Sequence, residues 1–225
     1  MPLPLTKAIA LLRRRYGRPR APPTRDPFEL ILIENIAYLA SPERRREAFA
    51  LLKQTVGTTP AAILGASRPA LERVTAHGIL KARFADKLRS CARIAVALGG
   101  DLAAALRGPL AQALRILRRF PGVAGPGADR ILLFSGRHAS LAPESNALRV
   151  LARLGYIEEG ASYARMYRAG NAAAAQLPAR FPTLMTAHLL LHEHGRTLCR
   201  RTRPLCAKCP LRRDCAHARR TEDRR

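Results

Sequence analysis

The chain has 225 residues, of which 48% are hydrophobic, so it can bury one large core or two small ones and is not a disordered basic tail. No stretch reaches the roughly 18 uncharged apolar residues of a membrane span, and the apolar run at 8–12 is too short for a secretion signal, which predicts a cytoplasmic protein. The 40 Lys and Arg against 16 Asp and Glu give a net charge of +24, spread over the whole length. Such a field favours a polyanionic partner, with nucleic acid before an anionic membrane surface.

Helical spacing of apolar residues dominates the chain, and the alternation typical of strands is absent. A short helix at 1–18 is followed by a proline-rich extended linker at 19–27. Further helices are expected at 28–40, 43–55, 59–65, 69–75, 81–97, 101–106, 109–118, 126–135, 144–155, 161–174 and 182–195. We therefore predict an all-α protein.

Residues 113–134 contain two helical patterns joined by a tight Pro/Gly turn, the layout of a helix-hairpin-helix. Glycines let the turn backbone approach a phosphate, and the N-terminus of the second helix attracts that anion. Arg119 and Arg130 flank the turn and are candidates for further phosphate contacts. The expected contact residues within the turn are Gly122, Val123, Ala124, Gly125 and Gly127. A plain αα-hairpin that binds nothing stays open as the alternative.

Four of the five cysteines lie within 17 residues in the pattern C-x6-C-x2-C-x5-C, namely Cys199, Cys206, Cys209 and Cys215. Four bare thiolates so close together would repel one another, so a metal ion or cluster is expected to bind them. Disulfides are disfavoured in a cytoplasmic chain. Zinc stays open as an alternative, although only Cys206 and Cys209 form the short knuckle typical of zinc ribbons. Cys91 lies in an apolar helical stretch and is expected to be an ordinary core residue.

From about Leu5 to Cys215, the order of the hairpin and the cysteine pattern resembles the endonuclease III branch of the helix-hairpin-helix DNA glycosylases. The matching segments are Phe120-Pro121-Gly122-Val123, Asp26-Pro27-Phe28-Glu29-Leu30, Leu148-Arg149-Val150 with Arg153-Leu154-Gly155, and His194-Gly195-Arg196 before Cys199. Such proteins flip a nucleotide out of the duplex and cut its N-glycosidic bond. The resemblance implies base-excision repair of double-stranded DNA that contains a lesion or mismatch, by a monomeric, nucleoid-associated bacterial protein.

The family's cysteine spacing marks members with a [4Fe–4S] cluster, so the resemblance implies that cofactor here. The cluster loop, 199–215, would bring Arg200, Arg201 and Arg203 to DNA. The implied fold has two all-α domains. Residues 28–135 form a helical barrel that includes the hairpin at about 112–135, and residues 1–27 with 136–225 form the cluster-bearing domain.

The chain departs from the family at the hairpin lysine that attacks the sugar in members with lyase activity. The matching residue is Pro126, and Ala124 replaces the second hairpin glycine. The family's catalytic aspartate lies 18 residues beyond the lysine position, which here is Glu144, directly before a helix. The helix dipole would keep that carboxylate ionised, as suits a group that stabilises an oxocarbenium-like sugar or orients water. A helix cap without a catalytic role is the alternative.

A second carboxylate, Glu34, interrupts an apolar helix seven residues after Pro27, the offset of the catalytic Glu in the adenine-excising MutY-type members. Desolvation would raise the pKa of this carboxyl, so that it could protonate a departing purine. A buried Glu paired with an arginine is the alternative. Tyr38 and Leu39 stand where many family members have a glutamine-containing stretch that fills the gap left by the flipped base, and either could wedge the base stack.

Three functional hypotheses follow from the sequence. The first is a monofunctional DNA glycosylase that uses Glu34 and Glu144. The second is a catalytically weak or silent DNA-structure-binding protein on the same scaffold. The third, a glycosylase whose lyase activity uses another amine, ranks last.

Overall fold

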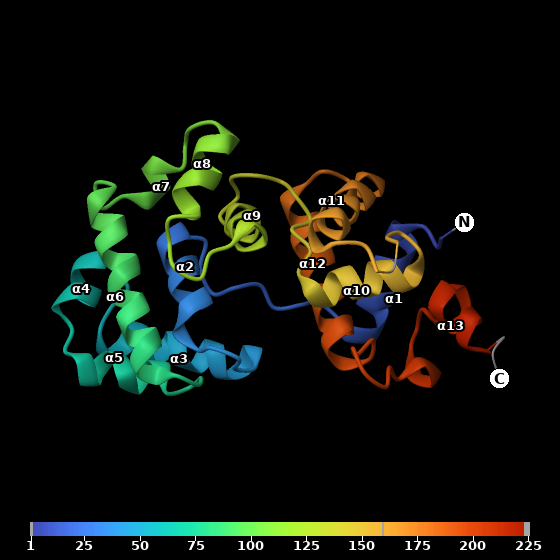
Figure 1. Cartoon of the computed structure of the whole chain (residues 1–225), viewed down its shortest axis with the longest axis horizontal. Coiled ribbons are helices and arrows are strands. Elements are labelled where there is room, and N and C mark those ends of the chain that lie inside the picture. The colour runs from blue at the N-terminus through green and yellow to red at the C-terminus, as the bar shows by residue number, and fades with distance from the viewer. Residues whose placement is uncertain (1, 159, 223–225) are drawn as a thin grey trace. The chain divides into compact units, whose positions relative to one another are not determined.

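The computed structural model describes residues 2–158 and 160–222, and within these ranges every regular element is a helix (Figure 1). The all-α prediction is confirmed. The chain divides into two compact units, Pro22–His138 and Met1–Ala21 with Ala139–Arg225. No described helix has both the length and the apolar character needed to cross a membrane.

The unit formed by Pro22–His138 contains α2 to α9. Their bounds are α2 (Pro27–Ile36), α3 (Pro42–Thr55), α4 (Pro60–Gly65), α5 (Arg68–Thr75), α6 (Lys81–Ala97), α7 (Leu102–Ala105), α8 (Leu110–Leu117) and α9 (Gly125–Phe134). The start of each of the helices α2 to α5 follows from local sequence, because an Asp, Ser or Thr side chain caps it and a proline occupies its first turn. Asp26, for example, accepts a hydrogen bond from the Glu29 amide before Pro27 begins α2.

Helix α2 is the core of this unit. Its side chains are buried on nearly all sides, and it packs on α3, α6, α7 and α9. Ile31, Leu32 and Ile36 are fully buried. A helix that is apolar all round belongs in a core, which explains why Glu34 stands out in its sequence.

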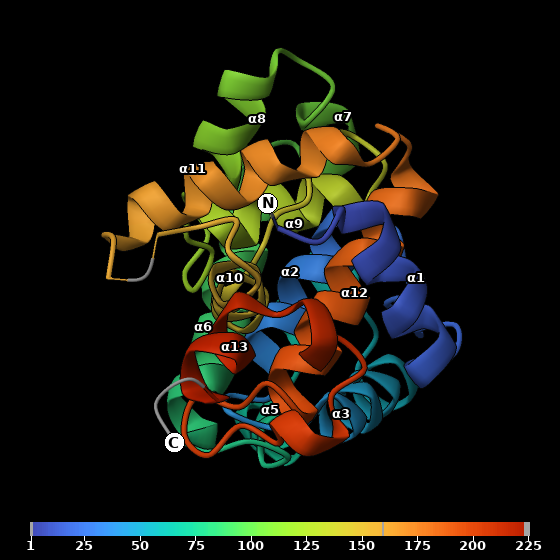
Figure 2. The ribbon, with the colours of Figure 1, turned by 90° about the vertical axis from the view of Figure 1, so that its right-hand side faces the viewer.

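The other unit contains α1 (Leu5–Tyr16), α10 (Ser145–Leu154), α11 (Tyr163–Ala173), α12 (Phe181–Thr197) and α13 (Ala216–Glu222), with short 3-10 turns between α11 and α12 and between the cysteines. Helix α12 is its centre and packs against both α10 and α1, as Figure 2 shows. The two helices α10 and α12 approach very closely at Gly195, where a Cβ atom would lie 2.6 Å from the Asn146 carbonyl oxygen. Only glycine fits at this crossing.

Candidate active site and nucleic-acid interface

The hairpin of α8 and α9 has an exposed turn anchored by buried side chains. Phe120 and Val123 are buried, whereas Gly122 and Ala124 are exposed. Because the Val123 side chain points into the core, only its backbone can take the predicted part in a DNA contact. Ala124 caps α9 without a side-chain hydrogen bond, which leaves the first amides of this helix to an external acceptor. The turn therefore has the geometry of an anion site.

Gly122 is required by its position in this turn. Its φ is 81°, and a Cβ atom there would lie 2.6 Å from the Oδ1 atom of the buried Asn35. We expect Gly122→Ala to lower the free energy of unfolding by about 1–3 kcal/mol and to weaken DNA binding. Gly125→Ala is the matched control, because a Cβ there meets only Arg118 Nη2, at 3.9 Å. Chemical denaturation and fluorescence anisotropy with a labelled duplex measure both effects, and equal results for the two variants would contradict the assignment.

Glu34 forms an ion pair with Arg130 in which both carboxylate oxygens accept hydrogen bonds from the guanidinium. Arg45 lies close to the same pair and donates to the Ala37 carbonyl oxygen at 3.4 Å. Burial lowers the pKa of Arg45, and the nearby Glu34 carboxylate partly offsets this effect. The guanidinium expected to meet a phosphate thus binds Glu34 instead. The catalytic role of Glu34 and the DNA contact of Arg130 stay predictions.

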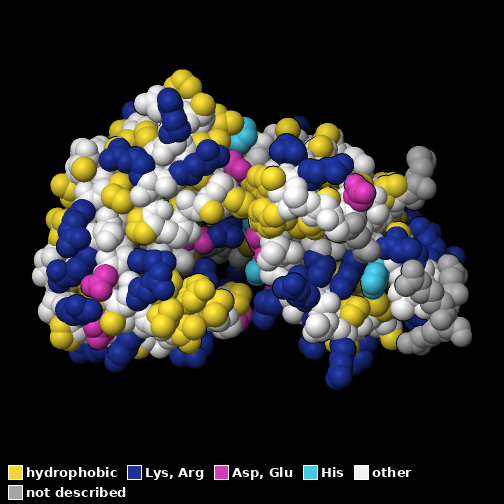
Figure 3. All heavy atoms as spheres, viewed as in Figure 1, with side chains coloured by type: hydrophobic (Ala, Val, Ile, Leu, Met, Phe, Trp, Pro, Cys, Tyr) yellow, Lys and Arg dark blue, Asp and Glu magenta, His cyan; other side chains and the backbone are white. Residues whose placement is uncertain are grey.

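Two neighbouring loops expose four large apolar side chains, which we call the apolar loop pair: Tyr38, Leu39, Ile79 and Leu80. The Ile79 amide donates to the Tyr38 carbonyl oxygen at 3.1 Å and joins the loops. Tyr38 stacks on Phe84 with ring centroids 4.8 Å apart, whereas Leu39 is 73% exposed. In Figure 3, hydrophobic side chains are visible among Lys and Arg in the lower part of the unit Pro22–His138.

Both loops of this pair carry backbone strain, because Leu39 and Leu80 have φ angles of 56° and 58°. The sequence predicted a role for Tyr38 and Leu39 but missed Ile79 and Leu80. The available signal was an Ile-Leu dipeptide directly after Gly78, between two helices.

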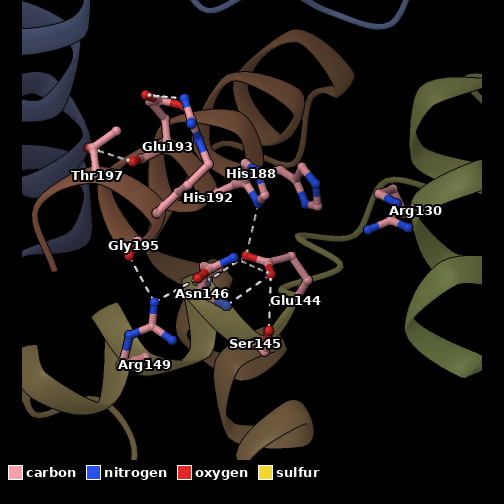
Figure 4. Close-up of polar contacts among 12 residues, drawn as sticks. Arg130, Glu144, Ser145, Asn146, Arg149, His188, His192, Glu193, Gly195 and Thr197 are labelled. Atoms are coloured by element: carbon pink, nitrogen blue, oxygen red, sulfur yellow. Dashed lines mark hydrogen bonds and ion pairs between the residues drawn. The ribbon is translucent and has the colours of Figure 1, made fainter. Parts of the chain in front are cut away.

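Glu144 is the N-cap of α10, and both of its carboxylate oxygens are occupied (Figure 4). Oε2 accepts from the Asn146 amide at 2.9 Å, from Asn146 Nδ2 at 3.0 Å and from Ser145 Oγ at 3.3 Å. Oε1 accepts from the Ala147 amide at 2.8 Å and lies 3.2 Å from His192 Nδ1. The cap that was the alternative reading is therefore present, while the catalytic role stays a prediction.

Burial of the Glu144 carboxyl raises its pKa, but the hydrogen bond from His192 and the amides of Asn146 and Ala147 outweigh burial and hold the pKa at about 2, against an ordinary 4.5. A depressed carboxyl pKa contributes stability that is fully present above about pH 4.5 and is lost as the pH falls toward 2.

We expect this contribution to be about 3 kcal/mol. Urea unfolding of the wild type and of Glu144→Gln at pH 5 and at pH 2.5 measures it. The wild type should lose more stability than the variant between these pH values, and parallel losses would contradict the assigned pKa.

A chain of polar contacts leads from Glu144 along α10 to the cysteine segment. Arg149 donates to Asn146 Oδ1 at 2.6 Å and to the carbonyl oxygens of Gly195 and Cys199, both at 2.8 Å. One turn later, Arg153 donates to the Cys199 sulfur at 3.3 Å and to the Arg200 carbonyl oxygen at 2.7 Å. Residues of this region line an open groove, namely Ser145, Asn146, Arg149, Gly195, Arg196, Arg200 and Arg201. Four arginines in one groove make it a candidate phosphate contact.

All four clustered cysteines line one largely apolar hollow of about 380 Å³, part of it open to solvent. Burial, together with the neighbouring sulfurs of Cys199, Cys215 and Cys206, raises the pKa of Cys209 to about 11. Within 2–158 and 160–222, no three or more His, Cys, Asp or Glu side chains converge as they would on one metal ion. The thiols surround a space and do not meet at a point. Arg200 and Arg203 are exposed beside them, and Arg203 has a strained φ of 50°.

The three histidines of α12 have separate partners. His188 is buried, and its Nδ1 lies 3.1 Å from the Leu141 carbonyl oxygen. His194 lies between Tyr16 Oη at 3.0 Å and Cys209 Sγ at 3.5 Å, and burial lowers its pKa to about 4. His192 contacts Glu144. The sequence did not predict the contact of His192 with Glu144.

This fold is similar to the folds of a solved endonuclease III and a solved thymine-DNA glycosylase. The chain matches the structure of a trapped endonuclease III–DNA covalent intermediate with a TM-score of 0.75 and 17% identity, over 98% of this chain and 99% of that one. It matches a thermostable thymine-DNA glycosylase with a TM-score of 0.76 and 16% identity, over 96% and 97%. The predicted fold is confirmed.

In sequence, the chain is 26% identical over 200 residues to endonuclease III of Sulfolobus acidocaldarius, covering 86% of this chain and 83% of the relative. No protein-family profile matches the chain. The resemblance to endonuclease III expected from the hairpin and the cysteines is confirmed.

Proposed function

We propose that the protein is a monofunctional DNA N-glycosylase, which excises a damaged or mispaired base and leaves the DNA strand intact. Two features of the chain together support this proposal. Glu144 provides an ionised carboxylate, and a proline, Pro126, stands at the lysine position of the hairpin. An imine with the sugar needs an amine, and Pro126 lies within α9 and has none to offer. Water is then the remaining nucleophile.

The proposed DNA contacts are phosphate contacts of the open α9 N-terminus and of the groove that Arg149, Arg196, Arg200 and Arg201 line. The net charge of +24 supports double-stranded DNA as the partner of a monomer. Glu144 would stabilise the positive charge that develops on the sugar as the glycosidic bond breaks.

A panel of duplexes that contain deaminated, oxidised, alkylated or mispaired bases tests the proposal. Each duplex is incubated with the enzyme and then treated with alkali. Strand breaks that appear only after alkali are the expected result. Breaks without alkali, together with an adduct trapped by borohydride, would show an amine-dependent lyase.

The second candidate function is a DNA-structure-binding protein with little or no catalysis. It is favoured by the ion pair of Glu34 with Arg130 and by the saturated carboxylate of Glu144. Tight binding to every duplex of the panel, without an alkali-sensitive site in any, would establish this candidate.

We propose that the apolar loop pair wedges the base stack when a nucleotide is flipped out. Tyr38 is held against Phe84, so Leu39, Ile79 and Leu80 are the free apolar tips. We expect Leu39→Gly to lower the excision rate about 10-fold and to leave the free energy of unfolding within about 1 kcal/mol, because the side chain is exposed and glycine tolerates φ 56°. Single-turnover assays and thermal unfolding measure the two effects, and an unchanged rate would exclude Leu39 as a wedge.

We further propose that Cys199, Cys206, Cys209 and Cys215 bind a [4Fe–4S] cluster. Their common hollow and the chemistry of four thiols fit such a group, which would cross-link 199–215 and bring positive charge to Cys199 and Cys209, the two thiols whose pKa burial raises. Around it, Arg153 would hold the loop by donating to Cys199 and to the carbonyl oxygens of Arg200 and Arg201.

A further inference from the structure

Glu144 is poorly suited to take a proton from water. A carboxylate offers about four lone-pair sites, and five donors already approach its two oxygens. Its pKa of about 2 also makes it a weak base at neutral pH. If water is the nucleophile, another group must accept the proton.

His192 lies beside this carboxylate, and its imidazole can accept a proton. Its Nδ1 lies 3.2 Å from Glu144 Oε1, and its side chain is 31% exposed. A hydrogen bond from Nδ1–H to a carboxylate fixes the tautomer in which Nε2 carries a free lone pair. Within the described residues, no protein group is in hydrogen-bond contact with this Nε2 atom. Figure 4 shows His192 reaching from α12 toward Glu144 at the start of α10.

His188, on the same helix, has the buried environment expected of a histidine with a structural role, and it serves as a comparison for His192. It lies one turn earlier, is 3% exposed, and contacts the Leu141 carbonyl oxygen. His192 differs in its exposure, and its Nδ1 contacts the Glu144 carboxylate. A Glu at position 144 also reaches one methylene further than an Asp would, far enough to cap α10 and contact His192 together.

We propose that His192 is the general base of the excision reaction, with Glu144 as the group that orients and stabilises its imidazole. The inference rests on the proposed glycosylase function. As the water oxygen bonds to C1′ of the sugar, the C1′–N bond breaks and its electron pair leaves with the base. The water proton passes to His192 Nε2 and from there to solvent, and the departing base takes a proton from solvent.

The test compares His192→Asn with His192→Ala in single-turnover excision of the base that the wild type removes. Asn can still donate to Glu144 from the place of Nδ1 but has no basic nitrogen. For a general base, both variants should be about 100-fold or more slower than the wild type, with Kd for an abasic-analogue duplex changed less than twofold. Imidazole in the buffer should partly restore His192→Ala.

An Asn variant with the wild-type rate would overturn the inference, because it would show that the contact with Glu144 suffices. Failure of imidazole to restore a folded His192→Ala would overturn it as well. Unfolding temperatures of the variants establish that they are folded. In these outcomes the wild type still excises a base, and the proposed function stands. A wild type that excises nothing overturns the proposed function and this inference with it.

Discussion

Glu144→Gln is expected to slow base excision about 100-fold or more under single-turnover conditions. The substitution removes a negative charge that would face the developing positive charge of the sugar, and electrostatic groups of this kind contribute several kcal/mol to a barrier. It also places an amide N–H₂ group opposite donors, since the Asn146 and Ala147 amides and His192 all approach the carboxylate.

The substitution also removes the ionised cap of α10, which should lower the free energy of unfolding at neutral pH by about 3 kcal/mol, the contribution of the depressed Glu144 pKa. Glu144→Asp is the matched control, because it keeps a carboxylate and a favoured cap residue. We expect its rate to lie between those of the wild type and the Gln variant. A Gln variant as fast as the wild type would show that Glu144 only caps α10.

Replacing a cysteine of the quartet is expected to have the second large effect. Cys206→Ser should remove the broad violet absorption typical of a [4Fe–4S] cluster and lower iron from about four atoms per chain. DNA affinity should fall at least about 10-fold, because Arg200 and Arg201 lie in the segment that the cluster would hold.

Cys91→Ala is the control for this experiment. Cys91 is fully buried against α2, and burial raises the pKa of its thiol to about 12. The variant should be less stable but keep its colour and iron. Colourless wild-type protein with stoichiometric zinc would contradict the cluster assignment.

The sequence predicted those features that depend on local order along the chain. The starts of α2 and α10 were predicted at 28 and 144, each one residue from the observed Pro27 and Ser145, and the Gly122 turn and the cysteine spacing are likewise readable within a few residues. Glu144 was found by its offset from the hairpin. Each of these follows from capping, glycine conformation or ligand spacing, which act over short distances.

The partners of these residues could not be predicted in the same way. Glu34 meets Arg130 across 96 positions, and Glu144 meets His192 only because α10 and α12 cross closely at Gly195. One backbone hydrogen bond, from the Ile79 amide to the Tyr38 carbonyl oxygen, joins two loops that are distant in sequence. Such contacts arise because the packing of apolar helix faces determines which polar side chains become neighbours. The sequence around each residue carries no signal for this.

In the proposed reaction, water takes the place of the missing lysine as the nucleophile. Excision in the presence of borohydride, followed by mass spectrometry of the treated strand, tests this on a duplex of the lesion panel. The expected products are a free base and a full-length strand with an abasic sugar, without a protein adduct. A cleaved strand linked to protein after borohydride treatment, or an unaltered strand for every base in the panel, would contradict it.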